Sequence, residues 1–149
     1  MAVAALLSAI HLLTLALGAG AIFARGRAMS RPLDDQGWKR LLAADNLWGI
    51  AALLWIVSGL ARVFCGGKEP SFYWLNGFFW LKMSLFLMVF ALEIAPMTTF
   101  MRARTAQSRG TAVPQVPLEL YRRINAAEFG LVVAIVFVAA FMARGAWLF

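Results

Sequence analysis

Lys82 is the residue that most requires a chemical explanation, because it lies inside the apolar run FFWLKMSLF at residues 78–86. An ammonium group near the centre of a membrane helix costs about 2.5–3.5 kcal/mol on insertion scales, and such residues tend to be functional. The aliphatic stem of Lys82 could carry the charge to the nearer headgroups, which is called snorkelling. Alternatively, the charge could lie buried and contact a substrate or cofactor. The sequence leaves both alternatives open.

His11 is the only histidine in the chain, and at 1.5 Å per residue it lies about 12–14 Å into the first apolar segment. Thr14, Gly18 and Ile22 follow on the same helical face. That face is small and partly polar, ends at Arg25, and is therefore expected to pack against other helices. His11 could form a hydrogen bond to a neighbouring helix, or it could ligate a metal or a cofactor.

A second group of polar residues is expected near the opposite membrane face. Glu93 follows Lys82 by three helical turns, so the two side chains lie roughly 16 Å apart and cannot form a direct pair. Glu93 should instead meet polar residues at the ends of the second and fourth apolar segments. These are Asp45, Asn46, Arg122, Arg123, Asn125 and Glu128, and Arg25 at the same end of the first segment belongs to the same polar cluster. We interpret this group as structural ion pairs, with Asp45 as a cap at the start of a helix.

The elements that must position these groups are membrane helices. Of the 149 residues, 62% are hydrophobic and 14% are charged, which is typical of a chain whose solvent is largely lipid. Backbone groups in lipid must be satisfied within each segment, which selects helices. We predict one all-α domain, a four-helix transmembrane bundle. The predicted helices are at about residues 3–25, 45–65, 77–101 and 118–143, each near the roughly 20 residues that cross a bilayer, with an interfacial helix at about 32–44.

The basic residues are distributed unevenly between the two ends of the predicted bundle. Ten flank the two long loops, and three lie near the opposite end. The ten are Arg25, Arg27, Arg31, Lys39, Arg40, Arg102, Arg104, Arg109, Arg122 and Arg123, and the three are Arg62, Lys68 and Arg144. By the positive-inside rule, both long loops are expected in the cytoplasm and both termini in the periplasm of a bacterial inner membrane. The net charge of +7 is thereby explained by topology, and nucleic acid is not an expected partner.

One histidine and one cysteine, Cys65, are too few for a histidine-rich metal site or for a Cys–His nucleophile with supporting ligands. Haem needs only one or two axial ligands, and helical bundles build such sites between facing helices. His11 could therefore ligate the iron of haem b. Lys82 or Arg62 could then lie near the propionates, since all three residues are expected in the same half of the bundle.

Three blocks of sequence, read in order, resemble the HemJ-type protoporphyrinogen oxidases, which are small four-helix bacterial membrane proteins. The blocks are LSAIHLLTLALGAGAIFARGRAM, GFFWLKMSLFLMVFALE and YRRINAAEFGLVVAIVFVAAFMARG. The resemblance implies that His11 is an axial ligand of haem b and that Lys82 is essential and contacts the cofactor. The oxidases carry further histidines that this chain lacks, so haem binding is the more transferable implication. DNLWGIAALLW at 45–55 and LEIAPM at 92–97 give a closer likeness, over nearly the whole chain, to another family of membrane proteins of about this length.

Two further functions remain open alongside a haem-binding, redox-active protein. A short chain with many Phe and Trp residues is also typical of an accessory subunit that packs against a larger membrane complex. In that case His11 and Lys82 would serve contacts between helices. A small transporter is the other alternative, and it would require a homo-oligomer, because four helices rarely enclose an alternating-access site alone.

Overall fold

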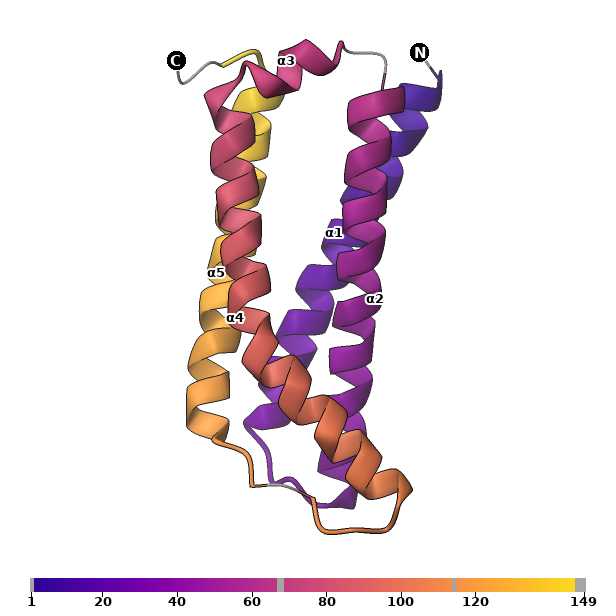
Figure 1. The fold of residues 1–149 in the computed structure, drawn as a ribbon, viewed down its shortest axis with the longest axis vertical. Helices are drawn as coiled ribbons and strands as arrows, with labels where there is room; N and C mark the ends of the chain where they lie inside the picture. The colour runs from indigo at the N-terminus through magenta and orange to yellow at the C-terminus, as the bar shows by residue number, and fades with distance from the viewer. Residues whose placement is uncertain (1, 67–68, 114, 147–149) are drawn as a thin grey trace.

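Four long helices run along the same axis of the protein (Figure 1). The computed structural model describes residues 2–66, 69–113 and 115–146. The long helices are α1 (Ala2–Met29), α2 (Asp35–Cys65), α4 (Gly77–Ser108) and α5 (Leu118–Ala143), and a short helix α3 (Pro70–Trp74) precedes α4. All four long helices have the length and hydropathy of membrane spans, and the described part of the chain contains no strand. The prediction of an all-α bundle of four spans is confirmed.

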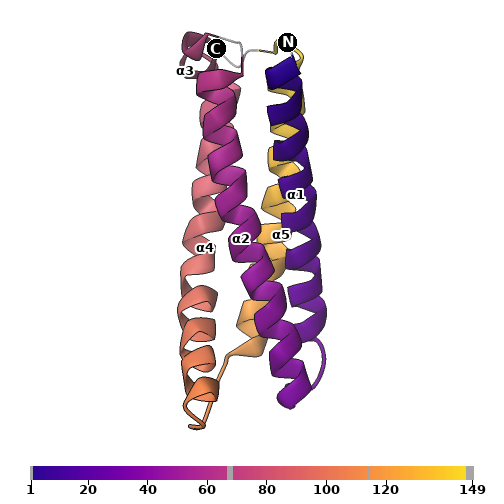
Figure 2. The same cartoon turned by 90° about the vertical axis from the view of Figure 1, so that its right-hand side faces the viewer.

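The bundle consists of two helix pairs. Helix α1 packs most extensively on α2, α4 packs on α5, and the two pairs meet mainly through α1 and α5 (Figures 1 and 2). The α1–α2 contact is close at Gly18, where an added Cβ would lie 3.0 Å from Cζ3 of Trp48. Thr14, Ile22 and Arg25 are buried on the same side of α1, so the face predicted to pack is the buried face.

The outer surface of the bundle is apolar on all sides. Large side chains such as Leu13, Phe23 and Phe64 are more than half exposed. In water, such continuous apolar surface would mark an interaction site or an aggregation risk, but lipid acyl chains cover it in a membrane. The central core lies between the two pairs, where Ile22, Trp48 and Val89 are buried. The protein is therefore a membrane protein with the lipid bilayer as its solvent.

Helix α2 is longer than the sequence predicted. The side chain of Asp34 accepts a hydrogen bond from the backbone N–H of Gly37 at 2.6 Å and caps the helix, which then runs without a break to Cys65. The separate interfacial helix predicted at 32–44 is wrong, since residues 35–44 are the first turns of the second span. Asp45, predicted as a helix-start cap, lies inside α2 instead.

Helix α4 also continues beyond its predicted end at residue 101, to Ser108, and it contains Pro96. Proline has no backbone N–H to donate and commonly bends a helix. Figure 1 shows α4 changing direction about half-way along its length. The hydroxyl group of Tyr121 lies 2.7 Å from Oγ1 of Thr99 and donates to the carbonyl of Ala95 at 3.3 Å, so α5 supports the helix beside the bend.

Both chain termini lie at the same end of the bundle as α3 (Figure 1). We call this the terminal end, and we call the opposite end, with the described connections at residues 30–34, 109–113 and 115–117, the loop end. Termini at one end are what an even number of spans requires. The assignment of the terminal end to the periplasm stays a prediction from the distribution of basic residues.

Candidate functional site

Arg25 is the centre of a buried ionic network that joins all four spans. Its side chain is only 1% exposed. Nη1 donates to the carboxylate of Glu93 on α4, with distances of 2.7 and 2.9 Å to the two oxygens, and lies 3.2 Å from Oδ1 of Asp45 on α2. Nη2 donates to Oε2 of Glu128 on α5. Nε donates to Oδ1 of Asn125, also on α5, at 2.8 Å.

Three further hydrogen bonds complete this network. Nη2 of Arg104 donates to Oδ2 of Asp45 at 2.6 Å and to the carbonyl of Leu42 at 3.2 Å. Nδ2 of Asn125 donates to the carbonyl of Ile22 at 3.1 Å, which ties α5 to the backbone of α1. We define the Arg25 network by its six side chains. They are Arg25, Asp45, Glu93, Arg104, Asn125 and Glu128. Buried charges are tolerated only when they are paired and hydrogen-bonded, and this condition explains why the groups converge on one guanidinium.

The network includes some of the residues predicted for the polar cluster and leaves others outside. Glu93 lies close to Asp45, Asn125 and Glu128 through their common partner Arg25. Three predicted residues lie outside the network. Asn46 is exposed on α2, and Arg122 and Arg123 pair with Glu119 at 3.5 and 3.3 Å on an exposed face of α5.

Arg104 is the network residue that sequence reasoning missed. It was assigned only to the basic flank of a cytoplasmic loop. Its spacing carried a usable signal, because Arg104 follows Glu93 by the same three helical turns that separate Glu93 from Lys82. Lys82, Glu93 and Arg104, three of the four charged residues of α4, therefore lie near one face of the helix.

His11 forms a second polar centre, nearer the terminal end. Its Nε2 accepts a hydrogen bond from the indole N–H of Trp55 at 3.0 Å, and its Nδ1 lies 2.8 Å from Oγ of Ser58. An indole nitrogen can only donate, so Nε2 is unprotonated and the ring proton is on Nδ1, which donates to Ser58. The hydroxyl group of Ser58 in turn donates to the carbonyl of Trp55 at 3.2 Å. His11 thus joins α1 to α2 through a closed set of hydrogen bonds.

This arrangement bears on the predicted ligation of haem. An axial ligand must offer iron an unprotonated ring nitrogen, and Nε2 of His11 is occupied by Trp55. Helix α2 also passes close to the ring, because a Cβ added at Gly59 would lie 3.3 Å from Cε1 of His11. The donor set as arranged does not fit haem, and ligation would require the indole of Trp55 to move away.

Arg62 and Lys82 are two cations near His11 that have no acidic partner among the described residues. Both side chains are half-buried, and they act electrostatically on each other and on His11. The Lys82 ammonium lies 5.1 Å from the ring centroid of Phe79, one turn nearer the terminal end. Its stem therefore points toward the terminal end, as in the snorkelling alternative, while the ammonium group keeps an aromatic contact.

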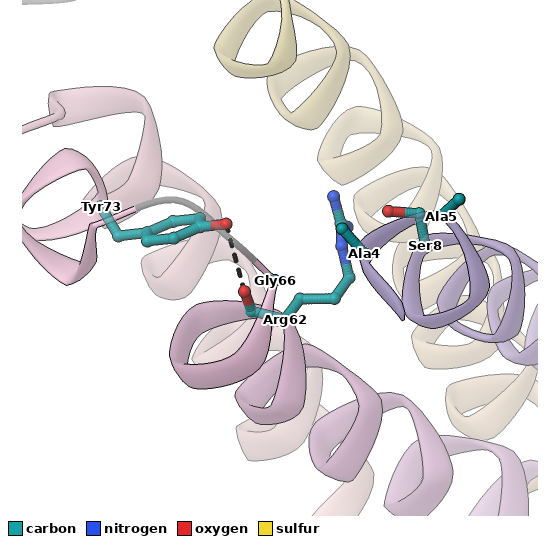
Figure 3. Close-up of a pocket in the computed structure, with 6 residues that line it drawn as sticks. All are labelled: Ala4, Ala5, Ser8, Arg62, Gly66 and Tyr73. Atoms are coloured by element: carbon teal, nitrogen blue, oxygen red, sulfur yellow. Dashed lines mark hydrogen bonds between the residues drawn. The ribbon is translucent and has the colours of Figure 1, made fainter. Parts of the chain in front are cut away.

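Arg62 lines a cavity of about 270 Å³ at the terminal end. Figure 3 shows its side chain reaching from α2 toward Ala4 and Ser8 of α1, with Tyr73 on the other side. The hydroxyl group of Tyr73 donates to the backbone carbonyl of Arg62 at 3.4 Å. The cavity therefore combines one guanidinium and the hydroxyl group of Ser8, as possible donors, with small apolar walls, which suits an anion with a few polar atoms.

Comparison with known proteins gives one match. Residues 3–146 match the sequence model of a family described as "Predicted membrane protein (DUF2214)". No curated protein and no solved structure matches this chain. The resemblance to HemJ-type oxidases therefore stays a prediction, whereas the expected likeness to a family of membrane proteins over nearly the whole chain is confirmed. Because the match covers almost all of its length, this four-span chain belongs to the DUF2214 family of membrane proteins.

Proposed function

We propose that this membrane protein binds the acidic headgroup of a membrane-embedded amphiphile at its terminal end, with Arg62 as the principal ligand and Lys82 as a second cation. The observation that carries the proposal is that Arg62 lines a cavity and pairs with no carboxylate in the described part of the chain. Charged side chains within a membrane span are costly unless they meet a partner. A bound anion would supply the missing partner for both cations.

The chemistry of the cavity limits the class of ligand. A guanidinium group binds phosphate or carboxylate oxygens through two parallel hydrogen bonds, and the hydroxyl group of Ser8 can add a third. At about 270 Å³ the cavity is at the lower limit of ligand pockets, which usually measure about 300–1,000 Å³. It suits a headgroup rather than a whole molecule. The apolar part of the ligand would lie along the lipid-exposed surface of the helices.

The test is the thermal unfolding of the purified protein in a neutral detergent with three probes that share a dodecyl chain. Dodecyl phosphate and dodecanoate are expected to raise the unfolding temperature, whereas dodecanol is not. A ligand at 100 times its Kd stabilises a folded protein by about 2.7 kcal/mol. A larger effect of the phosphate than of the carboxylate would favour a phospholipid-type ligand, and the reverse would favour a carboxylate such as a tetrapyrrole propionate.

The variants Arg62→Gln and Lys82→Met are expected to lose most of this stabilisation. Arg144→Gln is the matched control, because Arg144 is exposed at the same end of the bundle and forms no ion pair among the described residues. Equal stabilisation of the wild type and Arg62→Gln by the anionic probes would reject the proposal.

The sequence also predicts haem b ligated by His11, with oxidation of protoporphyrinogen as the most specific form of that hypothesis, and the hydrogen bonds of His11 make it the weaker alternative to the anion site. The nearby cations Arg62 and Lys82 support it, and the hydrogen bond from Trp55 to Nε2 opposes it. We expect wild-type protein mixed with haem to show no histidine-ligated b-type spectrum, and Trp55→Phe, which frees Nε2, to show one. A b-type spectrum of the wild type that disappears in His11→Ala would instead establish ligation.

Assembly of this chain with other chains is a further prediction from the sequence. An accessory role in a larger complex would be recognised by a partner that co-purifies under gentle extraction. A transporter would be recognised by a defined homo-oligomer. The two tests are independent of the anion site.

A further inference from the structure

The charges of the Arg25 network do not balance. Two guanidinium groups, those of Arg25 and Arg104, face three carboxyl groups, those of Asp45, Glu93 and Glu128. With every group ionised, the network would carry one net negative charge within the bundle. An uncompensated charge in a membrane interior is costly, so a bound positive charge is expected.

The hydrogen bonds show which carboxyl group lacks a partner for one of its oxygens. Both oxygens of Asp45 accept from guanidinium groups, and both oxygens of Glu93 accept from Nη1 of Arg25. Glu128 is different, because its side chain is 0% exposed and only Oε2 has a partner. Its Oε1 is the only carboxyl oxygen in the described part of the chain that is buried without a hydrogen bond.

The carboxyl groups of Glu93 and Glu128 also lie close together, because both contact the guanidinium group of Arg25. Two ionised carboxylates both accept and neither donates, so they repel at this range. One proton on the pair would remove this repulsion. The proton would also bind to the unsatisfied oxygen of Glu128 and remove the excess negative charge of the network.

A metal ion is a poorer occupant of this site than a proton. Cations such as Mg²⁺ or Ca²⁺ need about six or more oxygen ligands, and here the other carboxyl oxygens already accept from Arg25 or Arg104. The described residues contain no group of three or more His, Cys, Asp or Glu side chains that could hold a metal ion.

We infer that the Arg25 network is a proton-binding site, in which Glu128 holds a proton on Oε1 beside the carboxylate of Glu93. The groups that face Glu128 come from all the other spans and from its own helix. They are Arg25 on α1, Asp45 on α2, Glu93 and Arg104 on α4, and Asn125 on α5. Ionisable residues of this kind inside membrane bundles commonly mark proton relays.

The test is infrared spectroscopy of the full chain in lipid nanodiscs near neutral pH. A protonated carboxyl group has a carbonyl stretching band that an ionised carboxylate lacks, and the band shifts in D₂O. We expect this band in the wild type and in Glu119→Gln, its loss in Glu128→Gln, and a shifted but retained band in Glu93→Gln. Absence of the band from the wild type, its survival in Glu128→Gln, or its loss in Glu93→Gln would overturn the assignment.

Stability provides an independent readout of the same proton. Glu128→Gln replaces a neutral acid by a neutral amide of nearly the same shape, so its unfolding temperature should stay close to that of the wild type. Asp45→Asn removes an ionised group from between two guanidinium groups and should lower the unfolding temperature clearly. Equal losses in the two variants would show that Glu128 is ionised. Should Glu128→Gln fail to fold, ¹³C labelling of glutamate in the wild type would still test the inference, because a protonated glutamate would shift the carbonyl band and the absence of a shifted band would overturn the assignment.

Discussion

Replacing Arg25 by methionine is expected to remove most of the stability of the folded bundle. The guanidinium group is the common partner of Asp45, Glu93 and Glu128, and methionine offers none of its hydrogen bonds. Removing one partner of a buried ion pair costs about 3–5 kcal/mol, and a typical protein has only about 5–15 kcal/mol in total. The measurement is the yield of folded protein and its thermal unfolding in detergent.

Arg102→Met is the matched control for this prediction. Arg102 lies on the same loop-end half of the protein as Arg104, is exposed, and forms no ion pair among the described residues. Its replacement should change the unfolding temperature little. A triple variant with Arg25→Met, Glu93→Gln and Glu128→Gln should recover part of the lost stability, because the charge of Glu93 is then absent and Asp45 keeps Arg104 as its partner. A single Arg25→Met variant as stable as the wild type would contradict the role of this residue as the centre of the network.

The sequence predicts Arg25 as a member of the polar cluster, together with several of its partners, but its position at the centre of that cluster could not be read from the sequence. An arginine at the end of an apolar segment usually anchors the helix at the membrane surface. Whether it points to the headgroups or into the bundle depends on how the helix is rotated against its neighbours. The small-residue face that ends at Arg25 was the available signal, since it fixed which side of α1 packs.

Helix boundaries were predicted less well than helix number, and for a related reason. Hydropathy places the ends of a span where charges begin, which set the predicted start of the second span at Asp45 and the end of the third at residue 101. In the structure the charges of Asp45 and Arg104 are paired with one another inside the protein, so both helices continue past them. Hydropathy alone underestimates the length of a membrane helix whose polar residues pair with residues of the other helices.

The environment of His11 shows a different limit of prediction from the sequence. The sequence left open whether this residue forms a hydrogen bond to a neighbouring helix or ligates a cofactor. Its two partners, Trp55 and Ser58, are 44 and 47 residues away, and their spacing carries no motif. A tryptophan and a serine in an apolar helix are more often packing residues. Only the register of α1 against α2 brings their polar atoms to the imidazole ring.

That register depends on Gly18, and Gly18→Leu is the second variant with a large expected effect. A Cβ at this position would lie 3.0 Å from Cζ3 and 3.4 Å from Cε3 of Trp48, and 3.5 Å from Cβ of Ala51. Trp48 is buried and Ala51 has no exposed surface, so neither can move aside without disturbing the core. Inserting extra methylene groups into a packed core costs about 1–3 kcal/mol, and occasionally more.

Gly20→Leu is the control for Gly18→Leu, because it adds the same side chain to the same helix where nothing lies within 4 Å. It should leave the unfolding temperature unchanged or raise it slightly, since leucine has a higher helix propensity than glycine. Gly18→Leu should lower that temperature and also weaken the His11–Trp55 contact, because both depend on the approach of α1 to α2. A red or blue shift in tryptophan fluorescence confined to Gly18→Leu would report that separation. Similar stability of the two leucine variants would mean that the close contact at Gly18 does not set the register of the helices.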